Sequence, residues 1–349
     1  MAWIIFFGSL HSGVMSMDPK SILESVWKNA GESSGRNWLM AAVMPSLIFW
    51  GACGLVYCGI VYGWAQTAIW WEGQTDTLRT LLLIGSGLVI IVTAFGLELF
   101  GITLLRLAEG YWENILLIGK PLQKWLRRGF NKPHARWDEL SKKLTARDHP
   151  ELWKGSNKKK PENITDDEEI EFKRLDRQLH DLPPEEQTMP TRLGNILRSA
   201  ELYPLVHYGL DSIVVWSRLY PILPDGFRRQ IDDSRNALDA AVRLYFLAFL
   251  FSIIWAVEAA LLYSWLLIII PLGGLFVAWL IWYSALGAAA VYGELIRSVF
   301  DLHRFDLYRA LRLPMPANTE EERRLGEQIT LFLWRYTDME YDSSSMPPK

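Results

Sequence analysis

The sequence has little cysteine and few signs of catalytic chemistry. Its two cysteines, Cys53 and Cys58, lie five residues apart in one apolar run, so they do not face each other on a helix, and a secreted disulfide scaffold is excluded. The six histidines are scattered, with no two spaced three or four residues apart, and P-loop, H-E-x-x-H and C-x-x-C motifs are missing. Residues 31–35 match G-x-S-x-G but lack the preceding strand of a nucleophile elbow. We expect no catalytic residues, no metal and no cofactor.

Charge is missing from four long segments of the chain. These segments are residues 37–71, 80–97, 244–257 and 259–293. Uncharged apolar runs of this length are too long for core elements and are typical of helices that cross a bilayer, which need about 20 residues each. This excludes an ordinary soluble enzyme. The sequence predicts an all-α membrane protein in which two transmembrane helix pairs flank a helical cytoplasmic domain.

The charge pattern also predicts how the chain is divided. We expect an N-terminal cytoplasmic segment (1–37), transmembrane helices 1 and 2 (38–105), a cytoplasmic helical domain (106–241) with a basic linker (124–160), transmembrane helices 3 and 4 (242–293), C-terminal cytoplasmic helices (294–337) and a disordered tail (338–349).

Positive charge predicts the orientation of these helices. Of the 36 lysines and arginines, only Arg79 falls in a loop on the outer side. The positive-inside rule therefore places both termini and the central region in the cytoplasm. Residues 1–16 carry no charge and lack the features of a signal peptide. Either Met17 is the true start, or Met1 is and residues 1–16 form a short interfacial anchor.

The segment 124–160 is strongly basic. It contains twelve lysines and arginines against four acidic residues. Basic clusters next to a transmembrane helix are attracted to anionic lipid headgroups. A solvated linker with ordinary positive-inside bias is the alternative. Nucleic-acid binding is disfavoured because it needs interleaved aromatics on a fold, and Trp137 and Trp153 are thin support for it.

Helical periodicity continues beyond the predicted membrane segments. The second transmembrane helix is expected to run on to about Phe130, and a helix from Asp225 is expected to run straight into the third. The fourth segment is so long that it must tilt, kink at Pro271 or continue into the cytoplasm.

Capping and breaking signals predict shorter helices. Capping boxes at Thr165 and Thr319 each start a helix. Pro204, Pro221 and Pro224 are expected to break residues 189–241 into short elements.

Two strings of residues carry a resemblance. The stretch Pro190-Thr191-Arg192-Leu193-Gly194-Asn195 and the ending 300–308 (FDLHRFDLY) resemble strings that recur in uncharacterised bacterial polytopic membrane proteins. The resemblance covers about residues 189–335 and implies a bacterial inner (plasma) membrane, but no activity. The plan of two spans, a cytoplasmic domain and two more spans is similar to that of the bestrophin channels in layout alone.

Acidic residues within apolar runs are the leading candidates for a functional site. Glu98 lies near the cytoplasmic end of the second span, and Glu258 lies near the outer end of the third. A charge in a membrane is expensive and is retained for a purpose. Their depths differ too much for one carboxylate pair, but Glu98 is placed to meet Arg243 as an ion pair. Both acids could instead line a pore or a proton path.

Small residues recur at intervals of four, which is typical of close helix packing in a bilayer. The residues concerned are Gly59 and Gly63 in the first span, and Ala285, Ala289 and Gly293 in the fourth. They could pack helices within one subunit or between subunits.

These features favour a non-catalytic inner-membrane protein that works as an oligomeric scaffold or sensor through its cytoplasmic domain. The alternative is an oligomeric ion channel or membrane-depolarising pore, supported by the two acids and the bestrophin-like layout, although no selectivity filter is recognisable. A membrane enzyme would need a cluster of titratable groups that the sequence does not assemble.

Overall fold

The computed structural model describes residues 43–112, 119–148, 164–179, 182–262 and 265–339. The described residues form helices and no strand, which confirms the all-α class. Four stretches are long and apolar enough to cross a membrane, and they are Met44–Val61, Asp76–Leu99, Asp225–Leu261 and Ile269–Ala310. The expectations for residues 1–37, for Met17 and for residues 340–349 of the tail lie outside the described residues.

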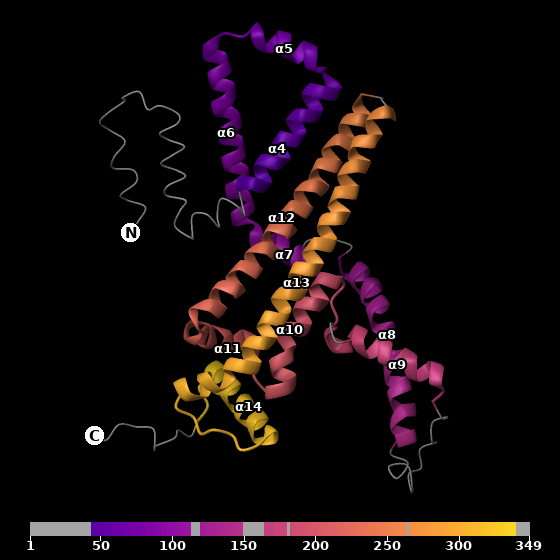
Figure 1. The fold of residues 1–349 in the computed structure, drawn as a ribbon, viewed down its shortest axis with the longest axis vertical. Coiled ribbons are helices and arrows are strands. Elements are labelled where there is room, and N and C mark those ends of the chain that lie inside the picture. The colour runs from indigo at the N-terminus through magenta and orange to yellow at the C-terminus, as the bar shows by residue number, and fades with distance from the viewer. Residues whose placement is uncertain (1–42, 113–118, 149–163, 180–181, 263–264, 340–349) are drawn as a thin grey trace, which may run out of the picture. The chain divides into compact units, whose positions relative to one another are not determined.

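The chain divides into two compact units at Phe95. The described part of the first unit contains α4 (Met44–Val56), a π-helical segment (Tyr57–Val61), α5 (Trp64–Glu72) and most of α6 (Asp76–Leu99) (Figure 1). The indole of Trp50 on α4 donates a hydrogen bond to Thr93 Oγ1 on α6 at 2.9 Å. Arg79 closes the turn between α5 and α6 by donating to the carbonyls of Trp71 and Glu72.

The expected packing stripe of Gly59 and Gly63 is not found. Gly63 has a φ of +85° and ends the first helical stretch, so the two glycines do not share one helix face. A side chain at Gly59 would meet the ring of Trp64, which belongs to the same part of the chain. A backbone conformation open mainly to glycine explains Gly63 better than helix packing does.

The second unit is built on two long helices, α12 (Asp225–Leu261) and α13 (Ile269–Ala310), which lie side by side (Figure 1). The helix expected to start at Asp225 is confirmed, since α12 begins at this residue. Pro224 precedes it in an extended conformation, which sets the start of the helix. The 42 residues of α13 include Pro271 near its start. At 1.5 Å per residue, α13 is about 60 Å long and continues well beyond the thickness of a bilayer.

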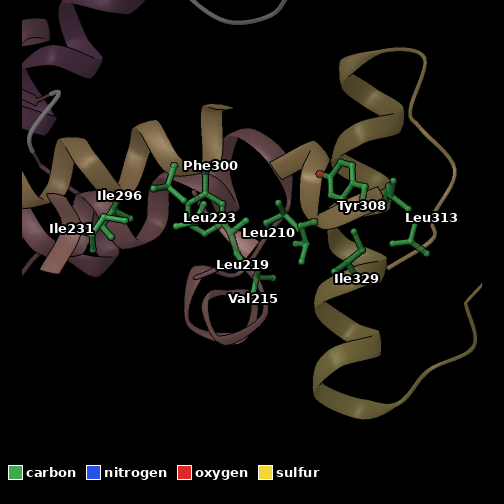
Figure 2. Packing of buried hydrophobic residues seen from close by; sticks show 13 residues of the cluster. Leu210, Val215, Leu219, Leu223, Ile231, Ile296, Phe300, Tyr308, Leu313 and Ile329 are labelled. Carbon is green, nitrogen blue, oxygen red and sulfur yellow. The ribbon is translucent and has the colours of Figure 1, made fainter. Parts of the chain in front are cut away.

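Four shorter helices pack against α12 and α13 or against each other beside them. They are α7 (Gly101–Glu109), α10 (Arg192–Tyr208), α11 (Ser212–Leu219) and α14 (Thr319–Arg335). Figure 2 shows the larger apolar cluster, in which Phe300 and Tyr308 of α13 meet Val215 of α11 and Ile329 of α14. These four side chains are fully buried. We call the packed helices around this cluster, together with the adjoining parts of α12 and α13, the helical core.

The helix expected from the second span to Phe130 is not continuous. α6 ends at Leu99 and α7 ends at Glu109, because Gly110 follows with a φ of +101°. The expected break at Pro204 is also wrong, because α10 runs through this proline. Proline removes one helical hydrogen bond, and burial of α10 from Leu193 to Pro204 offsets that loss.

The predicted basic linker is a helix, not a linker, over the part that the structure describes. Residues Gly119–Asp148 form one helix, α8, which pairs with the acidic helix α9 (Asp166–Leu179). Ion pairs join the two helices, at 2.9 Å for Arg136–Glu171, 2.7 Å for Lys143–Glu168 and 2.6 Å for Arg147–Glu169. Part of the positive charge assigned to lipid headgroups is therefore neutralised within the chain.

The two expected capping boxes have different outcomes. Thr165 and Glu168 exchange side-chain to backbone hydrogen bonds of 3.1 and 3.3 Å, as the capping box predicts. In the second, the capping residue is Asn318 rather than Thr319, and its side chain accepts from the amide of Glu321.

Gly326 offers a test of the helical core. A β-carbon at Gly326 would lie 1.9 Å from the carbonyl oxygen of Tyr208, so α10 and α14 touch through their backbones. We predict that Gly326→Ala lowers the free energy of unfolding by about 3 kcal/mol. The matched control, Gly129→Ala in α8, has open space around it and should be neutral or slightly stabilising. Thermal unfolding of the purified protein in detergent measures both variants, and equal shifts would contradict the contact.

Candidate functional site

The segment Pro190–Asn195 clamps the end of α7. Thr191 caps α10, since its hydroxyl oxygen accepts from the amide of Gly194 at 3.0 Å. The same hydroxyl is 2.8 Å from the carbonyl oxygen of Ala108 and 2.9 Å from that of Glu109, to which it donates. One threonine side chain thus satisfies a free amide at the start of α10 and free carbonyls at the end of α7.

Gly194 and Asn195 complete the clamp. A β-carbon at Gly194 would lie 2.1 Å from the carbonyl oxygen of Glu109, so only glycine permits this approach. The fully buried amide of Asn195 accepts from the amide of Met189 and donates to the carbonyls of Met189 and Thr191. Together these contacts fix the backbone of Glu109 against the first turn of α10.

Glu109 lies at the edge of a cavity of about 250 Å³. The cavity is bounded by α7, α10, α11, α12 and α13. Its lining is mainly apolar, with three charged side chains and one phenol, and consists of Glu109, Leu197, Ala200, Glu201, Ser212, Ile213, Trp216, Arg235, Tyr292 and Ile296. Concave, mostly apolar sites with a few polar groups are the usual form of small-molecule sites.

The charged groups of the cavity differ in how they are paired. Arg235 lies 3.2 Å from Asp239 and places its guanidinium 5.6 Å from the centre of the Tyr292 ring. Glu201 is paired with Arg198 at 3.2 Å. Among the described residues, Glu109 has neither an ion pair nor a side-chain hydrogen bond. It is therefore the carboxylate of this site that is open to a ligand or a proton.

Burial, and after it the negative charge of Glu201, raise the pKa of Glu109 from its usual range to about 7. Arg235 and Arg106 act against this shift, and Asp239 adds to it weakly. A carboxylic acid with a pKa near neutrality exchanges its proton under ordinary conditions, and such groups concentrate at functional sites. The arrangement can bind a small molecule and can change its own charge when it does so.

The ion pair expected between Glu98 and Arg243 is present in the structure. Arg243 Nη1 lies 3.0 Å from Glu98 Oε2, with the arginine side chain 7% exposed and that of Glu98 50% exposed. Glu258 lies fifteen residues further along α12, or roughly 22 Å at 1.5 Å per residue. It is half-buried, and its carboxylate has no ion pair or hydrogen bond within the described part of the chain. The structure thus brings Glu98 to Arg243 and keeps Glu258 apart.

The stripe of Ala285, Ala289 and Gly293 packs inside the chain. Both alanines are fully buried, in a cluster that includes Leu193 and Leu197 of α10. A β-carbon at Gly293 would lie 3.2 Å from that of Ala200. Of the two alternatives left by the sequence, the structure shows contact within one subunit.

Sequence reasoning missed Glu109, Glu201 and Arg235 as members of one site. Each looks like an ordinary surface charge on its own helix, and they come from three separate parts of the chain. One signal was present, because the string Pro190–Asn195 that carried the resemblance is the segment that holds Glu109 in place.

Comparison of the chain with protein-family models, with curated proteins and with solved structures finds no match. The fold itself defines the class: the chain is an all-α membrane protein with a cavity among its helices.

The raised pKa of Glu109 predicts a pH-dependent stability. Below pH 4.5 the group is protonated in both the folded and the unfolded chain. As pH rises from 4.5 to about 7, only the unfolded chain gives up the proton, so folding becomes less favourable by up to about 3 kcal/mol and stays so above pH 7. We predict that Glu109→Gln stabilises the protein at pH 8 but not at pH 4.5.

Thermal unfolding in detergent across this pH range measures the effect. The matched control is Glu320→Gln, whose side chain on α14 is 78% exposed. A pH profile of Glu109→Gln that runs parallel to that of the wild type would contradict the assignment.

The Glu98–Arg243 pair predicts an interaction energy. Arg243→Ala should destabilise the wild type by about 1 kcal/mol more than it destabilises Glu98→Gln, because only the wild type is left with an unpaired carboxylate. The exposed pair Glu320–Arg324 serves as the control and should show an energy near zero. The double-mutant cycle is measured by unfolding in detergent. Equal interaction energies for the Glu98–Arg243 and Glu320–Arg324 pairs would show that burial of Arg243 does not strengthen its ion pair.

Proposed function

We propose that this chain is a non-catalytic bacterial inner-membrane protein that works as an oligomeric scaffold or sensor through its helical core. One observation carries the proposal. The two longest helices run without interruption from apolar stretches into the walls of the cavity, where α12 supplies Arg235 and α13 supplies Tyr292 and Ile296.

This continuity supports a sensor in physical terms. A molecule in the cavity touches the same two helices that are long and apolar enough to cross the membrane. If it binds one arrangement of these helices better than another, it shifts the balance between the arrangements by its difference in affinity. No separate transmission element is needed, because each helix is continuous from the apolar stretch to the cavity.

The orientation is part of the proposal. With both termini and the helical core in the cytoplasm, only Arg79 among the lysines and arginines faces outward. The first half of α8 then presents four cations around an open groove that Glu185 and Glu186 also line, and the cations are Lys120, Lys124, Arg127 and Arg128. None of these four has an ion pair among the described residues, in contrast to the second half of α8. We propose that this groove meets anionic lipid headgroups.

An ion channel or pore remains the second candidate, on the strength of Glu258. This half-buried carboxylate lies within the apolar stretch of α12 and has no ion-pair partner among the described residues. Acidic residues in such positions mark ion or proton pathways in many membrane proteins. The paired state of Glu98 weakens the same argument for that residue.

Ion flux separates the two candidates. We predict that purified wild-type protein in liposomes conducts no ions above the level of empty vesicles. Glu98→Gln and Glu258→Gln are measured alongside it, with Glu320→Gln at an exposed position of α14 as the control. Flux from the wild type that falls in Glu258→Gln, at unchanged thermal stability, would overturn the scaffold or sensor and favour the pore.

A further inference from the structure

The cavity next to Glu109 contains one carboxylate that has no ion-pair partner among the described residues. Of its two acidic lining residues, Glu201 is paired with Arg198 at 3.2 Å, whereas Glu109 is paired with no cation of the described chain. The one lining cation, Arg235, is already engaged by Asp239 and by the face of Tyr292. The unmet electrostatic need of the site is therefore a positive charge near Glu109.

The rest of the lining selects the kind of cation. Leu197, Ile213 and Ile296 supply apolar surface, and the ring of Trp216 lies on the same cavity. Aromatic faces attract organic cations, and the guanidinium of Arg235 over Tyr292 shows the same geometry in this cavity. Within the described residues there is no group of three or more side chains able to hold a metal ion. The chemistry therefore fits an organic cation better than a metal.

We propose that this cavity binds a small organic ammonium ion, whose charge lies between Glu109 and Glu201 and whose carbon atoms pack against Trp216 and Ile213. A volume of about 250 Å³ equals roughly eight water volumes, which suits a ligand of about eight non-hydrogen atoms. The inference rests on the proposed sensor and deepens it by naming the class of molecule that is sensed.

Binding of such a cation is coupled to a proton. The groups that face Glu109 are Arg106 on α7, Tyr111 just after α7, Glu201 on α10, Arg235 and Asp239 on α12, and Tyr292 on α13. A cation favours the ionised form of Glu109, so binding releases a proton when the pH is near or below the raised pKa of about 7. The affinity accordingly rises with pH and levels off above this value.

Isothermal titration calorimetry of the full-length protein in detergent tests the proposal. The probes are choline and its uncharged isostere 3,3-dimethylbutan-1-ol, together with butylammonium and butan-1-ol. We expect each cation to bind at least tenfold more tightly than its neutral counterpart. Glu201→Gln should weaken binding of the cations at least tenfold, while Glu320→Gln on α14 leaves it unchanged.

Proton release gives a second measurement. At pH 7, titrations in two buffers with different heats of ionisation should show release of a fraction of a proton by the wild type and none by Glu109→Gln. Absence of binding by both cations, equal binding of cations and neutral isosteres, or an unchanged affinity in Glu201→Gln would each overturn the proposal. Thermal unfolding of every variant confirms that it is folded.

The two proposals can fail separately. If the protein binds the cations and also conducts ions in liposomes, the scaffold or sensor proposal fails and the ligand-site proposal stands. If the protein neither binds the cations nor conducts ions, the ligand-site proposal fails and the scaffold or sensor proposal stands.

Discussion

The arrangement of the second unit depends on one backbone contact, the approach of Gly194 to the carbonyl of Glu109. At this point the end of α7 and the start of α10 each have backbone groups without helical partners, and the hydroxyl of Thr191 satisfies both sides. Because the contact leaves no room for a side chain, α7 cannot slide along α10. The position of Glu109, and with it the charge of the cavity, follows from this constraint.

Much of the fold could be predicted from the sequence, because the signals are local. Uncharged runs predict the apolar helices, and the unbroken periodicity after Asp225 predicts the start of α12. The Thr165 capping box is correct because its two partners lie three residues apart. The cap of α14 is displaced by one residue, since Asn318 and Thr319 are adjacent and both are good capping residues.

The candidate site could be predicted only in part, because its contacts are not local. Glu98 and Arg243 stand out as charges in apolar surroundings, and this made their pairing predictable. Glu109 and Arg235 have charged neighbours in the sequence, so nothing distinguishes them until α7 and α12 are brought together. The pairing of α8 with α9 was hidden for the same reason. A run of positive charge says nothing about an acidic helix that lies beyond it in the chain.

The unbroken course of α12 sets a rotational phase between the two ends of the helix. Arg235 faces the cavity and Arg243 faces Glu98, eight residues and slightly more than two turns later. Each residue of an α-helix turns the next by about 100°, so the spacing of these two arginines determines which side of the apolar stretch lies above the cavity. An insertion or deletion of one residue between Arg235 and Arg243 would turn one of them away from its partner by about 100°.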